Sequence, residues 1–325
     1  MVQALRNPRL PRPDAGDYPS LMRILILGGN GFIGTAVASL LVKRGHTVVA
    51  TTRPGSARRT LRTEITWVQA DIARLSTAQH WRPLLAGIYA VVNCAGALQD
   101  GLRDNVAALQ DRAMHALYEA APPFVVQVSA RTDGSASETE FLATKRRADT
   151  ALMSSGLSFV ILRPAVVVGR NAHGGTALLR ALAACPLVTP LAHADSPMQF
   201  VALDDVAQTV ADAIDGEIPD GSDIDLAAEG TTTLAEAVAI HRRWLGLAPG
   251  CTVALPDFAA RIVSTLADLL GYLGWRSPLR STALVAAAGG VAGHSAPMAR
   301  PLATLQETLA DNPAGVQDLW YARLY

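Results

Sequence analysis

The 325-residue sequence lacks the features that mark several large classes of protein. Charged residues make up only 17%, and basic and acidic residues balance at 28 each, so no excess of positive charge points to nucleic acid. No stretch of about 18 uncharged apolar residues occurs, and the nearest candidate, 283–293, is short and interrupted by glycine. The sequence therefore predicts a globular chain with no nucleic-acid partner and no membrane-spanning helix.

Cysteine and histidine are also scarce and scattered. Cys94, Cys185 and Cys251 are odd in number, lie far apart, and lack the paired spacing of disulfide-rich or zinc-binding proteins. The seven histidines form no cluster either, so no metal site is predicted. This pattern is typical of buried thiols in a reducing compartment, and it favours a cytoplasmic location.

The first 21 residues differ from the rest of the chain. Four prolines lie there among arginines and aspartates, without the apolar segment that a secretory signal needs. We interpret residues 1–21 as a disordered tail, or as an upstream extension of a protein that begins at Met22.

From Met22 onward, short apolar runs alternate with helical patterns. The runs expected to form strands are 23–27, 47–51, 65–68, 90–94, 124–128 and 159–162, and the helical patterns between them are 32–44, 76–85, 104–121 and 138–154. Such alternation predicts an α/β fold, a doubly wound parallel sheet with helices on both faces. Because the rhythm becomes irregular after Gly169, we expect a main domain over 22–169. Residues 170–325 would form a smaller C-terminal region on the substrate side, part of which returns to the sheet.

A glycine-rich loop joins the first predicted strand to the first predicted helix. Its G-x-x-G-x-x-G spacing permits a tight turn, close approach of the backbone to a pyrophosphate, and close packing of helix on strand. The amides at the helix N-terminus would then face the phosphates. A glycine-rich turn without a ligand is the alternative. We predict a Rossmann domain that contacts a dinucleotide through Gly28, Asn30, Gly31, Phe32, Ile33 and Gly34.

The second predicted strand ends without the acidic residue that holds the ribose 2′-hydroxyl of NAD. No aspartate or glutamate occurs between Gly34 and Glu64. An arginine suits the 2′-phosphate of NADP, whereas a carboxylate would repel it. NADP(H) is therefore preferred, with NAD(H) as the alternative cofactor and a solvated basic turn as the alternative interpretation. The arginines that crowd this turn are Arg53, Arg58, Arg59 and Arg62.

Three further motifs follow the glycine loop: Val-Asn-Cys-Ala-Gly at 92–96, Leu-Arg-Pro-Ala-Val-Val-Val-Gly at 162–169, and Val-Ala-Leu-Asp-Asp-Val-Ala at 201–207. In this order they resemble the extended and atypical short-chain dehydrogenase/reductase superfamily, to which NAD-dependent epimerases and dehydratases belong. The resemblance runs from about residue 23 to residue 247. The chain is also similar to atypical members associated with respiratory complex I, and to bacterial members followed by a DoxX-like membrane module, which is absent here.

The resemblance implies roles for matching positions. We interpret Asp205 as the N-cap of a helix, and Asp71 has the alternative role of capping a turn. The implied cofactor contacts are Asp71 and Ile72 at the adenine, Asn93, Ala95 and Gly96 along the ribose and phosphates, and Pro164 at the nicotinamide.

One departure from the family pattern affects the chemistry. In the superfamily a tyrosine and a lysine four residues apart share one helix face, and a nearby serine holds the substrate oxygen. The matching positions here are Phe141, Lys145 and Ser129. Phenylalanine has no proton to exchange, and general acid–base catalysis needs a titratable group within reach. The resemblance thus implies Lys145 and Ser129 as the reaction centre, with the catalytic tyrosine replaced.

Two functions remain compatible with this departure. The chain is either an oxidoreductase or epimerase/dehydratase-type enzyme in which Ser129, Lys145, water or the substrate handles the proton, or a non-catalytic NADP(H)-binding structural or redox-sensing protein. Hydride transfer belongs to the cofactor, which favours the enzyme. His173 and His193 are candidate surrogate acids, because the pKa of histidine lies near neutrality. The alternative is that each is an ordinary solvated loop histidine.

An apolar stripe at helical spacing spans residues 258–273 within the unusually apolar last 70 residues. It consists of Phe258, Ile262, Leu266, Leu269, Leu270 and Leu273. Such a stripe is typical of core or subunit contacts, and a peripheral membrane or membrane-protein partner is the alternative. The substrate is an unidentified small molecule, and the sequence does not specify the oligomeric state.

Overall fold

The computed structural model describes residues 21–55, 63–97, 105–131, 139–272, 290, 291, 300–315 and 318. Residues 1–20 of the predicted 1–21 tail lie outside these residues, as do Arg58, Arg59, Arg62 and Leu273.

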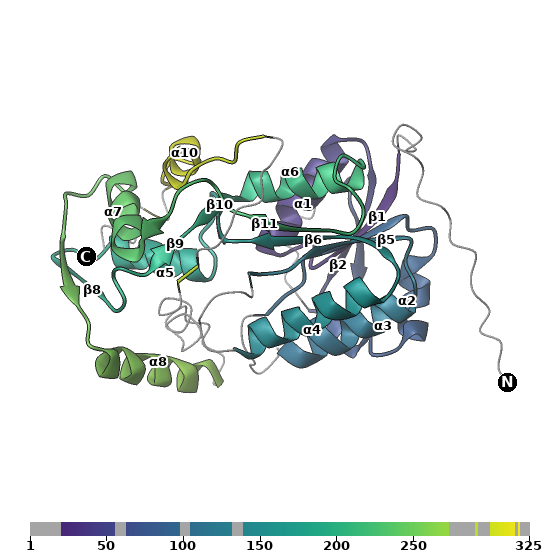
Figure 1. Ribbon diagram of the computed structural model, residues 1–325, viewed down its shortest axis with the longest axis horizontal. Helices are drawn as coiled ribbons and strands as arrows, with labels where there is room; N and C mark the ends of the chain where they lie inside the picture. The colour runs from purple at the N-terminus through teal and green to yellow at the C-terminus, as the bar shows by residue number, and fades with distance from the viewer. Residues whose placement is uncertain are drawn as a thin grey trace.

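A seven-stranded parallel sheet forms the centre of the protein, with the strand order β11-β6-β5-β4-β1-β2-β3 (Figure 1). From the boundary between β1 and β4, the strands that follow in sequence are added toward one edge of the sheet as β2 and β3, and toward the other edge as β5, β6 and β11. This is the arrangement of a doubly wound Rossmann sheet. The predicted fold class is confirmed. The strands are β1 (Arg23–Leu27), β2 (Thr47–Thr52), β3 (Thr66–Gln69), β4 (Ala90–Asn93), β5 (Phe124–Val128), β6 (Ser158–Pro164) and β11 (Ser222–Leu226).

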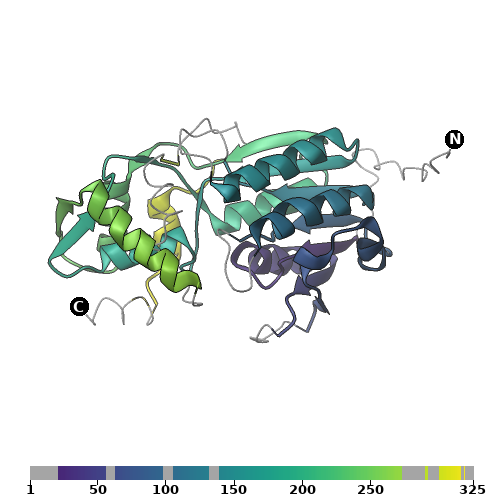
Figure 2. The ribbon, with the colours of Figure 1, turned by 90° about the horizontal axis from the view of Figure 1, so that it is seen from below.

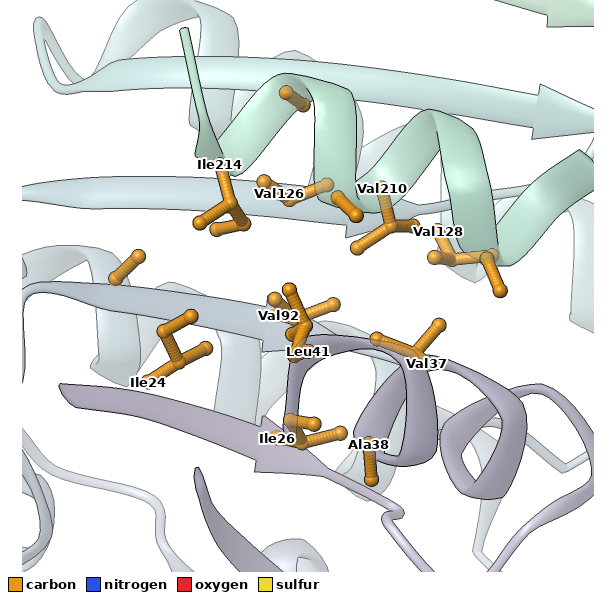
Figure 3. Packing of buried hydrophobic residues seen from close by; sticks show 14 of the residues in the cluster. Ile24, Ile26, Val37, Ala38, Leu41, Val92, Val126, Val128, Val210 and Ile214 are labelled. Carbon is orange, nitrogen blue, oxygen red and sulfur yellow. The ribbon is translucent and has the colours of Figure 1, made fainter. Parts of the chain in front are cut away.

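Apolar side chains on both faces of the sheet bind it to two layers of helices. Ile24 and Ile26 point to α1 (Phe32–Lys43) and α6 (Leu203–Ile214), where they pack beneath Val37 and Val210 (Figure 3). Leu25 belongs to the core on the other face, as alternation along a strand requires. The elements of that second layer are η1 (Ile72–Arg74), α2 (Ala78–Leu85), η2 (Ala108–Arg112), α3 (Ala113–Glu119) and α4 (Glu140–Ser154).

The C-terminal region forms a smaller body beside the carboxyl ends of the strands (Figure 1). Three two-stranded sheets pair β7 with β10, β9 with β12, and β8 with β13. The strands are β7 (Val166–Val168), β8 (Val188–Leu191), β9 (Pro197–Met198), β10 (Phe200–Ala202), β12 (Thr232–Thr233) and β13 (Cys251–Ala254). The helices are α5 (Gly175–Ala183), α7 (Leu234–Trp244), α8 (Asp257–Tyr272) and α10 (Leu305–Asp311).

The predicted capping role of Asp205 is wrong. Strand β10 leads directly into α6, whose N-cap residue is Ala202, so Asp205 lies inside the first helical turn. Its carboxylate instead pairs with Arg300 and accepts a hydrogen bond from the Ala303 amide at 2.8 Å. The acid therefore fastens the segment before α10 to the Rossmann half.

The apolar stripe on α8 faces outward. Phe258, Ile262 and Leu269 are exposed by 69%, 57% and 62%, and Leu266 is exposed as well. The helix contacts the rest of the protein through its small residues instead, among them the buried Ala260 and Ala267. Figure 2 shows α8, in light green, along the outside of the C-terminal region. A core role for the stripe is thus wrong for these residues, and the interface role stays a prediction.

Among the described residues, no helix combines the length and the apolar character that a membrane crossing requires.

Candidate functional site

The glycine loop is fastened to the end of β2. The Gly28 and Gly29 amides donate to the side-chain and backbone oxygens of Thr51 at 3.0 and 3.1 Å, and Gly31 closes the turn on the Gly28 carbonyl at 2.9 Å. Gly28 has a φ of +70°, a conformation that favours glycine. The first helical residues after this turn begin at Phe32, so their amides point out of the carboxyl end of the sheet.

The shape of the loop fits a pyrophosphate. A Cβ on Gly34 would lie 2.9 Å from the Gly28 carbonyl carbon, 3.0 Å from Gly29 Cα and closer still to the Gly28 oxygen. Only glycine lets α1 begin this near to β1, which brings the helix N-terminus and its amides beside the loop. The predicted phosphate cradle of residues 28–34 therefore has the required geometry in the folded chain.

The ends of β2 and β3 place the residues predicted at the adenosine side. Arg53 directly follows β2 and is half-buried. Asp71 follows β3, where its carboxylate pairs with Arg74 at 3.2 Å, while Ile72 is buried in the core. Asp71 makes no side-chain cap for the turn that follows, so the structure does not support the turn-capping alternative.

Asn93 has a structural task at the end of β4. Its side chain is buried; the amide nitrogen donates to Gln127 at 2.9 Å and to the Met114 sulfur at 3.0 Å, and the oxygen accepts from the Ala95 amide at 3.0 Å. These bonds hold the turn that presents Ala95 and the exposed Gly96. A direct contact between Asn93 and a cofactor stays a prediction.

Lys145 lies buried at the carboxyl ends of β4 and β5. Helix α4 begins at Glu140 after the cap residue Thr139, whose hydroxyl accepts from the Leu142 amide at 3.3 Å. One turn further along, Lys145 Nζ donates to the Val128 carbonyl at 2.9 Å and lies 3.9 Å from where a Cβ on Gly96 would stand. Burial lowers the pKa of Lys145, although Asp149 and Cys94 oppose the shift.

Ser129 belongs to a buried polar network. Its backbone amide, just after β5, donates to the Leu162 carbonyl on β6 at 2.8 Å, and its hydroxyl donates to Asp149 Oδ2 at 2.6 Å. Arg163 contacts the same carboxylate oxygen at 2.8 Å and also pairs with Asp223 on β11 at 2.7 Å. Sequence reasoning missed Asp149, although it lies four residues after Lys145 and hence on the same side of α4.

The position of the missing tyrosine remains apolar in three dimensions. Phe141 is half-buried in the first turn of α4, one turn before Lys145. Tyr118, on α3, is buried in the core on the Leu25 face of the sheet, and its hydroxyl has no hydrogen-bond partner among the described residues. Burial raises the pKa of Tyr118 well above its usual range, so this phenol does not replace the missing one.

The two loop histidines contact residues other than Lys145. The His173 ring stacks on Phe32, with ring centroids 5.6 Å apart and an angle of 15° between the planes. His193 Nε2 lies 3.6 Å from an Asp257 oxygen on α8. Pro164, by contrast, is buried at the carboxyl end of β6, on the side where the nicotinamide is expected.

Comparison with known proteins agrees with this geometry. The family model described as NAD(P)H-binding matches residues 28–217, more than half of the chain, and the chain belongs to that family. The match supports a nicotinamide cofactor for this chain, and its contact with the glycine loop stays a prediction. The prediction of an NAD(P)-binding protein with a Rossmann fold is confirmed at the level of family and fold.

Solved structures with the same fold are epimerase-like. A putative epimerase from Burkholderia cenocepacia is 20% identical, with a TM-score of 0.65 over 93% of this chain and 97% of that one. UDP-glucose 4-epimerase from Thermotoga maritima, solved with UDP-glucose, is 15% identical, with a TM-score of 0.60 over 73% and 87%. These identities establish a common fold and leave the substrate of this chain to be proposed.

Two curated relatives are uncharacterised proteins. A chloroplastic protein of Arabidopsis thaliana is 28% identical over 174 residues, and a protein of Mycobacterium tuberculosis is 26% identical over 224 residues. The matches cover 47% and 67% of this chain. They span 53% of the plant protein and 23% of the mycobacterial one, so the chain corresponds to only part of either relative.

Proposed function

We propose that this protein is an NADP(H)-dependent oxidoreductase of the short-chain dehydrogenase/reductase type, acting on a small molecule without the usual tyrosine. The observation that carries the proposal is the placement of Lys145. Its ammonium group is buried at the ends of β4 and β5, beside Gly96, one strand away from the β1–β4 boundary where the strand order of the sheet reverses. Ligands of doubly wound sheets bind in the crevice outside this point.

Different residues would bind different parts of the cofactor. The loop 28–34 would hold the pyrophosphate, Arg53 the 2′-phosphate, and Lys145 the ribose next to the nicotinamide. When bound, the nicotinamide supplies the hydride chemistry. The chain's own part is to orient the substrate oxygen and to move a proton near Ser129.

We expect Arg53→Asp to reverse the cofactor preference. Removing one charge-assisted contact of about 1.5–3 kcal/mol lowers NADPH affinity about 10- to 100-fold, because the new carboxylate also repels the 2′-phosphate. NADH affinity should change less. Fluorescence titration with both nucleotides measures this, with Arg82→Asp on the exposed surface of α2 as the control for the change in net charge. Equal NADPH affinity in Arg53→Asp and wild type would contradict the assignment.

The second candidate function is a protein that holds NADP(H) without turnover. Phe141 favours it, because no titratable side chain stands one turn before Lys145. The hydrogen bonds of Lys145 to Val128 and of Ser129 to Asp149 favour it too, because both polar groups are used within the chain.

Phe141→Tyr separates the two candidates. A phenol one turn before Lys145 supplies the absent acid, and general acid–base catalysis contributes about 10²- to 10⁴-fold. If the chain is an enzyme, we expect wild type to consume NADPH with cyclohexanone or 1-phenylethanone and the variant to consume it faster. Phe159→Tyr on β6 is the matched control and should show no gain. Tight NADPH binding with no turnover in wild type or in Phe141→Tyr would establish the holding function instead.

A further inference from the structure

Asp149 is the most deeply buried acid near the reaction centre. Its side chain is 1% exposed, and only one of its two carboxylate oxygens has partners among the described residues. That oxygen, Oδ2, receives the Ser129 hydroxyl and the Arg163 guanidinium. The other, Oδ1, is buried without a hydrogen bond among the described residues, an arrangement that costs free energy and calls for an explanation.

The bond to Asp149 fixes what Ser129 can do for a substrate. A serine hydroxyl carries one proton and two lone pairs, and an ionised carboxylate can only accept. Because Ser129 gives its proton to Asp149 at 2.6 Å, its oxygen can act toward a substrate only as an acceptor. The resting arrangement therefore suits a substrate hydroxyl, which donates, better than a carbonyl.

We propose that Ser129 and Asp149 form a proton relay in place of the missing tyrosine, with Ser129 touching the substrate and Asp149 as the positioning residue behind it. This inference rests on the proposed oxidoreductase function. In the oxidation of an alcohol to a ketone, the carbon gives its hydride to the oxidised nicotinamide. The hydroxyl proton passes to Ser129 Oγ as the proton of Ser129 passes to Asp149 Oδ2. Reduction of a ketone runs through the same atoms in reverse.

The surroundings of Asp149 suit a proton acceptor. Burial raises its pKa, while the hydrogen bond from Ser129 and the charges of Arg163 and Lys145 oppose the rise, and the more distant Asp223 adds to it. The charge of the Asp149 carboxylate also raises the pKa of Tyr118 on α3. Desolvation makes the carboxylate a stronger base than one on the surface, while the neighbouring cations favour its ionised form.

Other groups near Lys145 are less suited to this task. Burial raises the pKa of the Cys94 thiol to about 12, although Lys145 opposes the shift, so the thiol neither ionises nor accepts a proton at neutral pH. Lys145 itself donates to the Val128 carbonyl. Of the titratable side chains in this cluster, Asp149 is the one that Ser129 contacts directly.

The relay is tested first by turnover in the full-length protein. Cyclohexanol, 1-phenylethanol and UDP-glucose serve as hydroxyl probes with NADP⁺, followed by the absorbance of NADPH. We expect Asp149→Asn and Ser129→Ala each to lower kcat/KM about 10²- to 10³-fold, with NADP⁺ affinity within twofold of wild type. Asp212→Asn, which removes a carboxylate from the Arg44 ion pair on the opposite face of the sheet, should leave both quantities unchanged.

Rescue distinguishes a relay from mere support of the fold. Adding Phe141→Tyr to Asp149→Asn supplies a different proton acceptor, so turnover should recover at least about tenfold. The pH at which kcat/KM reaches half its plateau should move upward, toward the range of a phenol. If Asp149→Asn does not fold, Ser129→Ala with Phe141→Tyr replaces it in the same comparison.

A second readout needs no turnover. Infrared titration of the NADP⁺-loaded protein should show an Asp149 carboxylate at pH 7 that becomes a carboxylic acid above the pH range of surface aspartates. This band should be absent from Asp149→Asn. A carboxylic acid already present at pH 7, or an unshifted titration, overturns the relay.

The outcomes separate the relay from the function on which it rests. Absence of turnover in wild type with every probe overturns the proposed function and the relay together. Turnover that survives Asp149→Asn or Ser129→Ala unchanged, or loss that Phe141→Tyr does not rescue, overturns the relay alone.

Discussion

Gly34→Ala is expected to abolish useful nucleotide binding. The new methyl group would stand 2.9 Å from the Gly28 carbonyl carbon and 3.0 Å from Gly29 Cα, where backbone rather than a flexible side chain must move. Relieving this overlap pushes α1 away from the loop, and the amides that face the phosphates move with it. Losing two charge-assisted hydrogen bonds costs at least about 3 kcal/mol, which corresponds to about a 100-fold loss of NADPH affinity.

Gly175→Ala is the matched control. It lies at the start of α5, and a Cβ there meets no atom within 4 Å. NADPH titration and thermal melts of both variants make the comparison. If Gly34→Ala binds NADPH like Gly175→Ala, the phosphate cradle is not where the geometry places it.

The stability of the fold is expected to fall steeply in mild acid, because His241 is buried in its neutral form. The ring is fully buried, Nδ1 contacts the Ala237 carbonyl at 2.8 Å, and its edge faces Trp244. Burial lowers the pKa of His241 from 6.5 to about 4, and the nearby Arg180 adds to the effect. The unfolded chain therefore takes up a proton below pH 6.5, whereas the folded chain takes it up only near pH 4.

The sign and size follow from this difference. The contribution of His241 to stability is complete above pH 6.5, and it is lost as the pH falls from 6.5 to about 4. The full loss is about 3 kcal/mol. Chemical denaturation at a series of pH values measures it. In His241→Phe, which keeps an aromatic ring beside Trp244, the pH slope over this interval should flatten; an identical slope in wild type and variant would refute the assignment.

Local patterns were sufficient to predict the Rossmann half. Most strands from β1 to β6 contain a short apolar run, and the glycine loop lies between a strand and a helix, so neighbouring residues determine both. The buried polar cluster proposed as the reaction centre could be predicted only in part. Lys145 and Ser129 were found by resemblance, whereas their partner Asp149 depends on which side of α4 meets the end of β5.

Long-range pairing explains what the sequence did not reveal. Asp205 is of a residue type common at helix N-caps, but its partner Arg300 comes 95 residues later in the sequence. The sequence left the direction of the α8 stripe open for a related reason. Ala260 and Ala267 fit closely against the protein, and periodicity alone does not tell which side of a helix does so.

The late position of β11 in the sequence has a consequence for synthesis. A ribosome that has delivered the first 169 residues has supplied six of the seven strands of the sheet, but neither the edge strand β11 nor α6. Until about residue 214 emerges, Ile24, Ile26 and Val126 lack α6, which shares with α1 the covering of this face in the finished protein. An emerging chain with such an uncovered apolar face is a natural client for a chaperone on the ribosome.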